Sequence, residues 1–360
     1  MRTEILQKDF WMNKMNKTKY RLPAEWEEHK STIICWPHQK EDWPGKFSPV
    51  PWVYVEIVKN IVPGELVRII VQSHMERTKV QKYLERAHVD LNNIEFIITQ
   101  TDRGWMRDPS PAFVKKGKET AAVKFVFNGW AKYSNWKKDK NIPATLSKVL
   151  DVELIEAEHK ERAIVLEGGA IDSNGCGTLL TTEECLLDSK TQVRNPGFTK
   201  KDYEAVFKKY LGITNVIWLG KGIAGDDTHG HVDDLCRFVN KNTVVLCREK
   251  NPNDENYKPL EENFERMKDI RLEDGSKINV VELPMPKPLC FEDLRLPASY
   301  ANFYISNNAV LVPTFNDPND RIALNILKDF FPEREVVGIH TVDLVWGLGT
   351  IHCLSHEEPL

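Results

Sequence analysis

Residues 225–234 hold the densest set of groups able to do chemistry in this sequence, two histidines and four aspartates separated by two glycines. Such a set suits either cation binding beside a proton-transfer group or a metal site. His229, His231 and Asp233 alternate, so an extended backbone would place all three on one face. A metallohydrolase built on these residues is one interpretation. Because no other Cys and His residues show clear ligand spacing, we expect no metal.

Three further positions can supply reactive groups. Asp108 closes the run Trp105-Met106-Arg107-Asp108, and Glu167 precedes a pair of glycines. Cys353 follows a glycine-rich segment that includes Gly349. Taken singly, these features also fit a surface ion pair, a β-bulge and a core cysteine. A cysteine with remote histidine and carboxylates is, however, the usual pattern of a nucleophile whose partners meet only in space.

Together these groups predict attack by a cysteine on a planar guanidinium or amidine. Asp108 and Asp233 would bind the cation bidentately and leave its central carbon open to the Cys353 thiolate. His231 would protonate the leaving ammonia and then take a proton from water, with Glu167 orienting the imidazole. The expected partner is a small-molecule guanidine. A guanidine-binding protein without turnover is the alternative outside the enzymes.

A repeated pattern of predicted elements positions these groups. Four hairpins, each with an Asn-, Gly- or Lys-rich turn, begin near Phe113, Ile171, Phe238 and Tyr304. A helix and then an apolar strand are expected after each hairpin. The helices are predicted at residues 143–150, 199–210, 260–270 and 317–330, and the strands at 152–155, 215–219, 278–283 and 335–339.

The N-terminal part supplies a fifth unit of this ββαβ type. Its strands are predicted at residues 32–36, 66–71 and 94–98 and its helices at 52–62 and 75–87; we expect residues 350–354 to pair with residues 32–36 and close it. Units of this size cannot bury their apolar faces alone, so five of them predict a closed ring. The polar runs before the hairpins would then face one central site.

The bulk composition indicates one soluble domain. Hydrophobic residues make up 41% and charged residues 28%, and the net charge of −4 argues against nucleic-acid binding. Seven cysteines without CxxC spacing, no signal-peptide pattern and no membrane-length apolar stretch predict a cytoplasmic protein. We expect an N-terminal tail at residues 1–20, which can be disordered, and a single catalytic domain at residues 21–360. A homo-oligomer is left open.

The sequence resembles the agmatine deiminases and the related Porphyromonas-type peptidylarginine deiminases from about residue 22 to its end. Each motif that carries the resemblance occurs in order along the chain. They are Ala24-Glu25-Trp26, Trp36-Pro37-His38, Trp105-Met106-Arg107-Asp108, Leu166-Glu167-Gly168-Gly169, Leu179-Leu180-Thr181-Thr182-Glu183-Glu184-Cys185, Arg194-Asn195-Pro196, Gly230-His231-Val232-Asp233 and Ile351-His352-Cys353.

The resemblance implies a five-bladed pseudosymmetric α/β propeller and an enzyme that converts agmatine and water to N-carbamoylputrescine and ammonia, toward putrescine. No metal or organic cofactor is implied. The site residues carried over are the nucleophile Cys353, the acid/base His231 and its partner Glu167, the guanidinium ligands Asp108 and Asp233, and the substrate-pocket residues Trp105, Asp227 and Gly349. Asp227 would face the distal amine of the substrate.

The sequence also departs from the agmatine deiminase pattern. His229 and Asp234 stand where asparagines are usual, and Ser355-His356-Glu357-Glu358 replaces a segment that usually carries Gln-Gln. We expect these changes near the substrate end of the pocket, where they would affect which guanidine binds. A deiminase of peptidylarginine or free arginine is therefore the first alternative. An amidinotransferase, which would exclude water, is the second.

Overall fold

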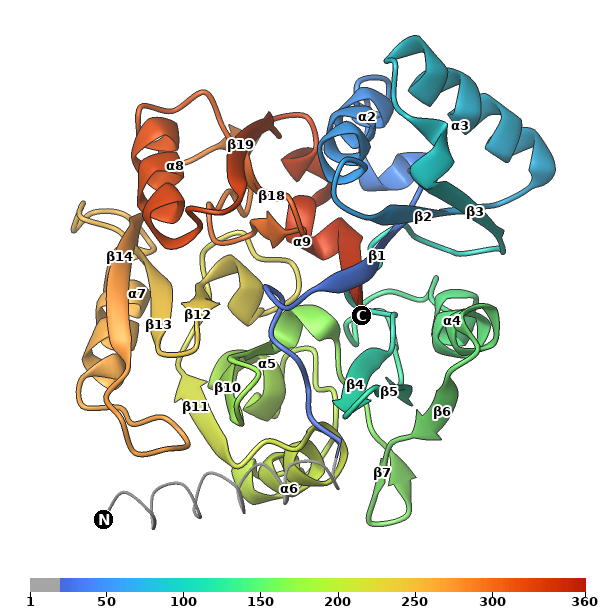
Figure 1. Ribbon diagram of the computed structural model, residues 1–360. Coiled ribbons are helices and arrows are strands. Elements are labelled where there is room, and N and C mark those ends of the chain that lie inside the picture. Colours follow the sequence, from blue (N-terminus) through green and yellow to red (C-terminus); the bar gives the residue numbers. More distant parts are fainter. Residues whose placement is uncertain (1–19) are drawn as a thin grey trace.

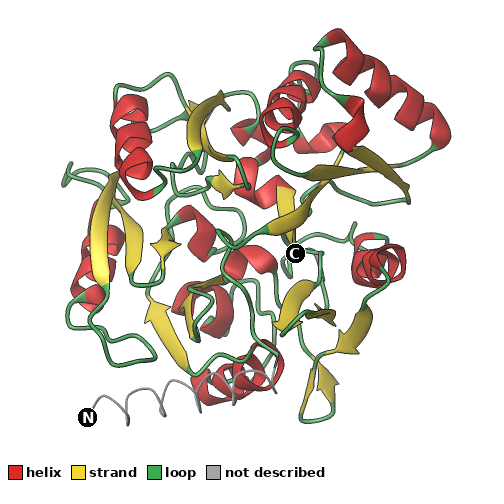
Figure 2. Ribbon diagram, in the orientation of Figure 1, coloured by secondary structure: helices red, strands yellow, loops and turns green. Residues whose placement is uncertain are grey.

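The computed structural model describes residues 20–360, so the predicted tail at residues 1–20 lies outside the described residues except for Tyr20. The described chain has an α/β fold with mixed sheets. Five sheets of three or four strands lie around the middle of the molecule in Figure 1. The longer helices lie toward the outside of the molecule (Figure 2). No helix in the described part of the chain is long and apolar enough to cross a membrane.

Four sheets have the predicted order of an antiparallel hairpin, a helix and a parallel strand. In each, the second hairpin strand is central and pairs with both neighbours. The elements are β4 (Ala112–Lys116), β5 (Glu119–Lys124), α4 (Ile142–Leu150) and β6 (Glu153–Glu156); β9 (Asp172–Ser173), β10 (Thr178–Thr182), α6 (Lys200–Val206) and β11 (Asn215–Leu219); β12 (Cys236–Asn240), β13 (Thr243–Arg248), α7 (Tyr257–Met267) and β14 (Asn279–Pro284); and β17 (Tyr304–Ile305), β18 (Ala309–Thr314), α8 (Asn319–Phe330) and β19 (Glu335–His340).

The fifth sheet joins the two ends of the described chain. It contains β20 (Ser355–Pro359), β1 (His29–Cys35), β2 (Leu66–Val71) and β3 (Ile94–Ile98), with α2 (Val50–Ile61) and α3 (His74–Arg86) between the parallel strands. The predicted closure is confirmed, but the predicted strand is wrong by several residues. The partner of β1 is β20, and Ile33 pairs with His356. The preceding residues form the short helix α9 (Ile351–Leu354).

Local sequence signals account for the helix ends. Thr199 accepts a hydrogen bond from the backbone N–H of Asp202, whose side chain accepts one in return from the backbone N–H of Thr199. This capping box starts α6 where the sequence predicts. The helix continues as a π-helical turn, η5 (Phe207–Leu211), and ends at Gly212, which has a left-handed φ of 70°.

Several short elements lie between or within these units. They are η1 (Lys40–Asp42), the hairpin of β7 (Glu158–His159) and β8 (Arg162–Ala163), η4 (Gly168–Ala170), α5 (Glu183–Leu187), η6 (Val232–Asp234), the hairpin of β15 (Cys290–Phe291) and β16 (Leu294–Arg295), and η7 (Val345–Gly347). The β15–β16 hairpin falls inside the Pro-rich stretch at residues 284–297, which the sequence marks only as a long surface loop.

Candidate functional site

The site is built from the residues that directly precede the first strand of each unit. Equivalent places in the five units therefore supply its polar groups, as the repeat predicts. They are Asp108 before β4, Glu167 before β9, His231 and Asp233 before β12, Asn302 before β17 and Cys353 before β20. All six side chains belong to buried residues, and Cys353 is the most exposed at 8%.

Cys353 is held in place by Asn302. The Asn302 side-chain amide donates to the thiol sulfur at 3.0 Å, and its carbonyl oxygen accepts from the Thr350 hydroxyl at 2.7 Å and the backbone N–H of His352 at 3.0 Å. Burial, then Asp233 and Asp234, raises the thiol pKa well above its usual range, whereas the Asn302 hydrogen bond lowers it. The cysteine is thus a neutral thiol until positive charge reaches it.

His231 lies among three carboxylates without a hydrogen bond to any of them. Nδ1 is 3.9 Å from both Asp108 Oδ1 and Asp233 Oδ1, and Nε2 is 4.0 Å from Glu167 Oε2. Among described residues, both ring nitrogens, Glu167 Oε2 and Asp233 Oδ1 are buried without hydrogen-bond partners. Burial, with a contribution from Arg194, lowers the His231 pKa well below its usual value. The neutral imidazole can therefore accept a proton.

Arg194 fixes Glu167 from the side opposite His231. Its Nε donates to Glu167 Oε1 at 3.1 Å, and both side chains are fully buried. Close packing around Glu167 also explains why residues 168 and 169 are both glycines. A Cβ on Gly169 would lie 2.5 Å from His231 Nδ1, and one on Gly168 would clash with the Arg107 carbonyl oxygen. Only glycine lets this turn approach the histidine.

Asp108 and Asp233 face the sulfur and the imidazole from two sides. Asp108 accepts from the Trp130 indole N–H at 2.7 Å and from the Gly169 backbone N–H at 3.0 Å. Burial, followed by the charge of Glu167, raises its pKa to about 7. The thiol of Cys353 donates to Asp233 Oδ2 at 3.8 Å, and burial, then Asp108, raises the Asp233 pKa well above its usual value. A bound cation would restore both carboxylates to their charged form.

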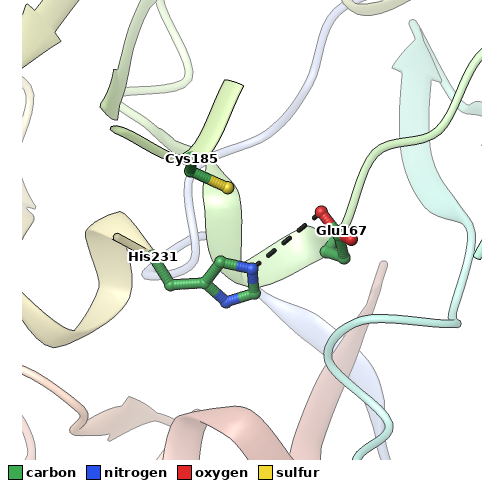
Figure 3. Close-up of side chains that lie close together, drawn as sticks. All are labelled: Glu167, Cys185 and His231. Carbon is green, nitrogen blue, oxygen red and sulfur yellow. Dashed lines mark ion pairs between the residues drawn. The ribbon is translucent and has the colours of Figure 1, made fainter. Parts of the chain in front are cut away.

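Cys185 is a second thiol beside the imidazole. It points from α5 toward His231 and Glu167 (Figure 3), and one ligand atom from each of the three residues lies within 4.8 Å of the others. The Arg194 guanidinium beside Glu167 opposes a cation here. Burial raises the pKa of the Cys185 thiol, which also opposes metal binding because a thiolate is the metal ligand.

A cavity of about 240 Å³, which we call the central cavity, leads to Cys353. Trp105, Asp108, Asp227, Gly349 and Cys353 line it, which brings together five residues predicted from the sequence. His231, Glu167 and Asp233 are not in its lining. A Cβ on Gly349 would lie 2.8 Å from the Trp105 ring, so glycine allows the loop before Cys353 to pack on the indole.

Carboxylates also line the central cavity away from the sulfur. Asp227 accepts from the Tyr133 hydroxyl at 2.7 Å and pairs with Lys132 at 2.5 Å. Asp42 accepts from the Trp105 indole N–H at 3.1 Å and pairs with Arg103 at 2.8 Å. Burial raises the Asp42 pKa to about 6 despite Arg103. The lining of the cavity therefore contains acidic groups in addition to Asp108.

Comparison with known proteins decides the family. Residues 21–359 match the model of the Porphyromonas-type peptidyl-arginine deiminase family. The chain belongs to this family. An agmatine deiminase of Ectopseudomonas mendocina is 32% identical over 94% of this chain and 95% of its own length. One of Pseudomonas fluorescens is 33% identical over the same shares.

Solved structures agree with this family assignment. The agmatine deiminase of Enterococcus faecalis has a TM-score of 0.86 at 28% identity, covering 96% of this deiminase-family chain and 97% of its own. A cysteine-to-serine variant of the C. jejuni agmatine deiminase, with substrate bound, has a TM-score of 0.84 at 31% identity, covering 94% and 96%. The α/β fold with mixed sheets is thus that of this family.

His229 does not line the central cavity of this deiminase-family member, contrary to the prediction. Its φ of 66° turns the chain, and its Nε2 lies 2.9 Å from Asp188 in a shallow surface pocket. His231 is buried instead, so the two histidines do not share the extended face that the metallohydrolase interpretation requires.

The other departures from the family pattern do not line the central cavity either. Asp234 accepts from the Asn302 side-chain amide at 3.0 Å, and its carboxylate lies within 4.8 Å of the Cys353 sulfur. Glu357 pairs with Arg107 at 2.8 Å, and His356 contacts the Pro111 carbonyl oxygen at 2.9 Å. Both residues line a second cavity of about 60 Å³ on another side of Glu167 and His352. Neither residue lines the central cavity.

Several site residues were missed from the sequence. Asn302 had a usable signal, because the repeat predicts a polar residue before the hairpin that begins near Tyr304. Trp130 and Tyr133 had no such sequence signal, since they reach the cavity from a loop between β5 and α4. Phe291 and Leu294, from the β15–β16 hairpin, also line the central cavity.

Proposed function

We propose that this protein is an agmatine deiminase, hydrolysing agmatine to N-carbamoylputrescine and ammonia, on the route to putrescine. The observation that carries the proposal is the cluster at the end of the central cavity. There Cys353, His231 and the carboxylates of Glu167, Asp108 and Asp233 meet around buried polar atoms that lack partners among the described residues. A planar cation with several N–H donors satisfies such acceptors.

The same geometry supports a covalent route. Asp108 and Asp233 bind the guanidinium, and its charge favours ionisation of Cys353, whose proton passes to His231. The sulfur forms a bond to the central carbon, and the carbon–nitrogen bond breaks as His231 returns the proton to the departing ammonia. The product of this half-reaction is an amidino-cysteine (thiouronium).

Water completes the turnover. His231, held by Glu167, takes a proton from water as the hydroxide adds to the amidino carbon. The carbon–sulfur bond then breaks, the sulfur leaves with that proton, and the hydroxyl proton of the product passes to solvent as the carbamoyl group forms. One water is consumed, one ammonia is released and the thiol is restored. The step uses no metal or organic cofactor.

The charge of the central cavity supports an amine-tailed substrate. Four acidic residues, Glu41, Asp42, Asp108 and Asp227, line it. Two cations offset them in part, since Arg103 pairs with Asp42 and Lys132 with Asp227. Free arginine would bring its carboxylate toward these acidic groups, which repel it. Peptidylarginine is the second candidate because the chain belongs to the Porphyromonas-type peptidyl-arginine deiminase family.

The organisation of the chain is part of the proposal. We propose one catalytic domain at residues 21–360, in the form of a five-bladed pseudosymmetric α/β propeller with the five site positions at its axis. The repeated hairpin–helix–strand order supports this arrangement. We also propose a cytoplasmic location, in keeping with free cysteines among the described residues.

Ammonia release tests the substrate assignment. The purified protein is given agmatine, arginine, a peptide with internal arginine and 1-butylguanidine, which lacks the amine. We expect the highest kcat/KM with agmatine. A higher kcat/KM with the peptide or with arginine would overturn the proposal.

A further inference from the structure

His352, the residue before the nucleophile, lies between two buried carboxylates. Its Nδ1 is 2.7 Å from Asp233 Oδ2, and its Nε2 is 2.7 Å from Glu25 Oε2. The imidazole and both carboxylates are almost fully buried. Glu25 comes from a sequence motif, Ala24-Glu25-Trp26, for which the reaction described above has no role.

These two contacts require two protons in the chain of three groups. A separation of 2.7 Å between nitrogen and oxygen needs a proton between them. Neutral imidazole carries only one N–H, which can satisfy one carboxylate. The other proton must lie on the second ring nitrogen or on a carboxyl group. Asp233, His352 and Glu25 therefore hold two protons between them. This is one more than they would hold with both carboxyl groups ionised and the histidine neutral.

Glu25 is not the group that holds this additional proton. Its Oε2 accepts from Arg237 at 2.9 Å and lies 3.4 Å from Arg107, and its Oε1 accepts from the Ile305 backbone N–H at 2.8 Å. Although burial opposes ionisation, the charges of Arg237 and Arg107 hold the Glu25 pKa well below its usual range, and a protonated His352 lowers it further. The additional proton is thus shared between Asp233 and His352.

Before substrate binds, the surroundings favour Asp233 as the group that carries the additional proton. Burial, then the arginine charges, lowers the His352 pKa, whereas burial and nearby carboxylates raise the Asp233 pKa. The charged and titratable groups that face this pair are Arg107, Arg237, Glu25, Asp108, Asp226, Asp234, Cys353 and His231. A guanidinium beside Asp233 Oδ1 reverses the preference, since it favours the carboxylate.

We propose that His352 stores the proton that Asp233 gives up when the guanidinium binds. The Asp233 Oδ2–H bond breaks and the His352 Nδ1–H bond forms, so the proton stays inside the protein. Asp233 becomes the carboxylate that holds the substrate, and Glu25 stabilises the imidazolium. His352 is a positioning residue, and this proposal rests on the function proposed above.

Proton release on binding tests the proposal. Cys353→Ala protein is titrated calorimetrically with agmatine near pH 8, where Asp108 is mostly ionised, in two buffers of different ionisation enthalpy. With His352 present, we expect few protons released. With His352→Gln added, Asp233 must release its proton to solvent, and the count should rise by up to about one per site. An unchanged count would overturn the proposal.

Two further variants make the result specific. Glu25→Gln keeps the imidazole but removes its stabilising carboxylate, so proton release should rise in the same direction even if His352→Gln does not fold. His356→Gln is the matched control, because that buried histidine faces the Pro111 carbonyl and should leave the count unchanged. A rise with His356→Gln equal to that with His352→Gln would contradict the proposal.

Free guanidinium separates this proposal from the substrate assignment. If guanidinium binds to Cys353→Ala protein and agmatine does not, the agmatine assignment fails and the His352 test is completed with guanidinium. Failure of both ligands to bind would contradict both proposals. In active protein, His352→Gln should make kcat/KM fall more steeply as the pH decreases, whereas a purely structural defect would lower it equally at each pH.

Discussion

The side-chain amide of Asn302 donates a hydrogen bond to the sulfur of Cys353 at 3.0 Å. Among the described residues, the other side-chain hydrogen-bond partner of that sulfur is Asp233, at 3.8 Å. The bond favours the thiolate, because a donor stabilises the charged form. Asn302 also ties the backbone of α9 through its carbonyl oxygen. Asn302 therefore orients Cys353 and favours its thiolate form.

Asn302→Ala should lower kcat roughly 10- to 100-fold, the usual effect of losing a hydrogen bond to a charged group. The rate of thiol alkylation against pH should shift to higher pH in the same variant. Asn253→Ala, on an exposed turn, is the control for asparagine loss. Unchanged alkylation and unchanged kcat would show that Asn302 does not act on the sulfur.

His229→Asn should leave the KM for agmatine unchanged within about twofold, since the His229–Asp188 pair lies outside the central cavity. A small loss of thermal stability is expected, because partly exposed ion pairs contribute little. Steady-state kinetics and a melting curve check both points. A tenfold change in KM would show that His229 does take part in substrate binding.

Asp227→Asn should raise the KM for agmatine about tenfold, corresponding to a lost charge interaction of about 1.4 kcal/mol. The KM for 1-butylguanidine should change far less, because that compound has no amine for Asp227 to bind. Asp188→Asn, outside the cavity, is the matched control. Equal effects on both substrates would mean that Asp227 supports the fold and does not recognise the amine.

The value of kcat/KM should fall as the pH decreases below about 7, the pKa to which burial and Glu167 raise Asp108. The sign follows from protonation. Below that pH the carboxyl group is neutral and attracts the guanidinium less, so binding weakens as the pH falls. A pH profile of kcat/KM measures the effect. A profile that stays flat down to pH 5 would contradict the role of Asp108.

Prediction from sequence succeeded where the determinants are local or repeated. Capping at Thr199 and the hairpin turns depend on neighbouring residues, and the repeat brought Asp108, Glu167 and Cys353 to equivalent places. The Glu25–His352 contact and the Asp42–Trp105 contact join distant segments and leave no mark on local sequence. The helix at Ile351–Leu354 was mistaken for a strand because Asn302 accepts N–H bonds from its first turn.

The central claim is that Cys353 attacks the substrate, and ammonia release from agmatine by two cysteine variants tests it most directly. Cys353→Ala should bind agmatine and release no ammonia above background. Cys185→Ala should retain most activity, although Cys185 also lies beside His231 and Glu167 (Figure 3). Ammonia release that persists in Cys353→Ala protein, or that disappears only in Cys185→Ala protein, would contradict the account.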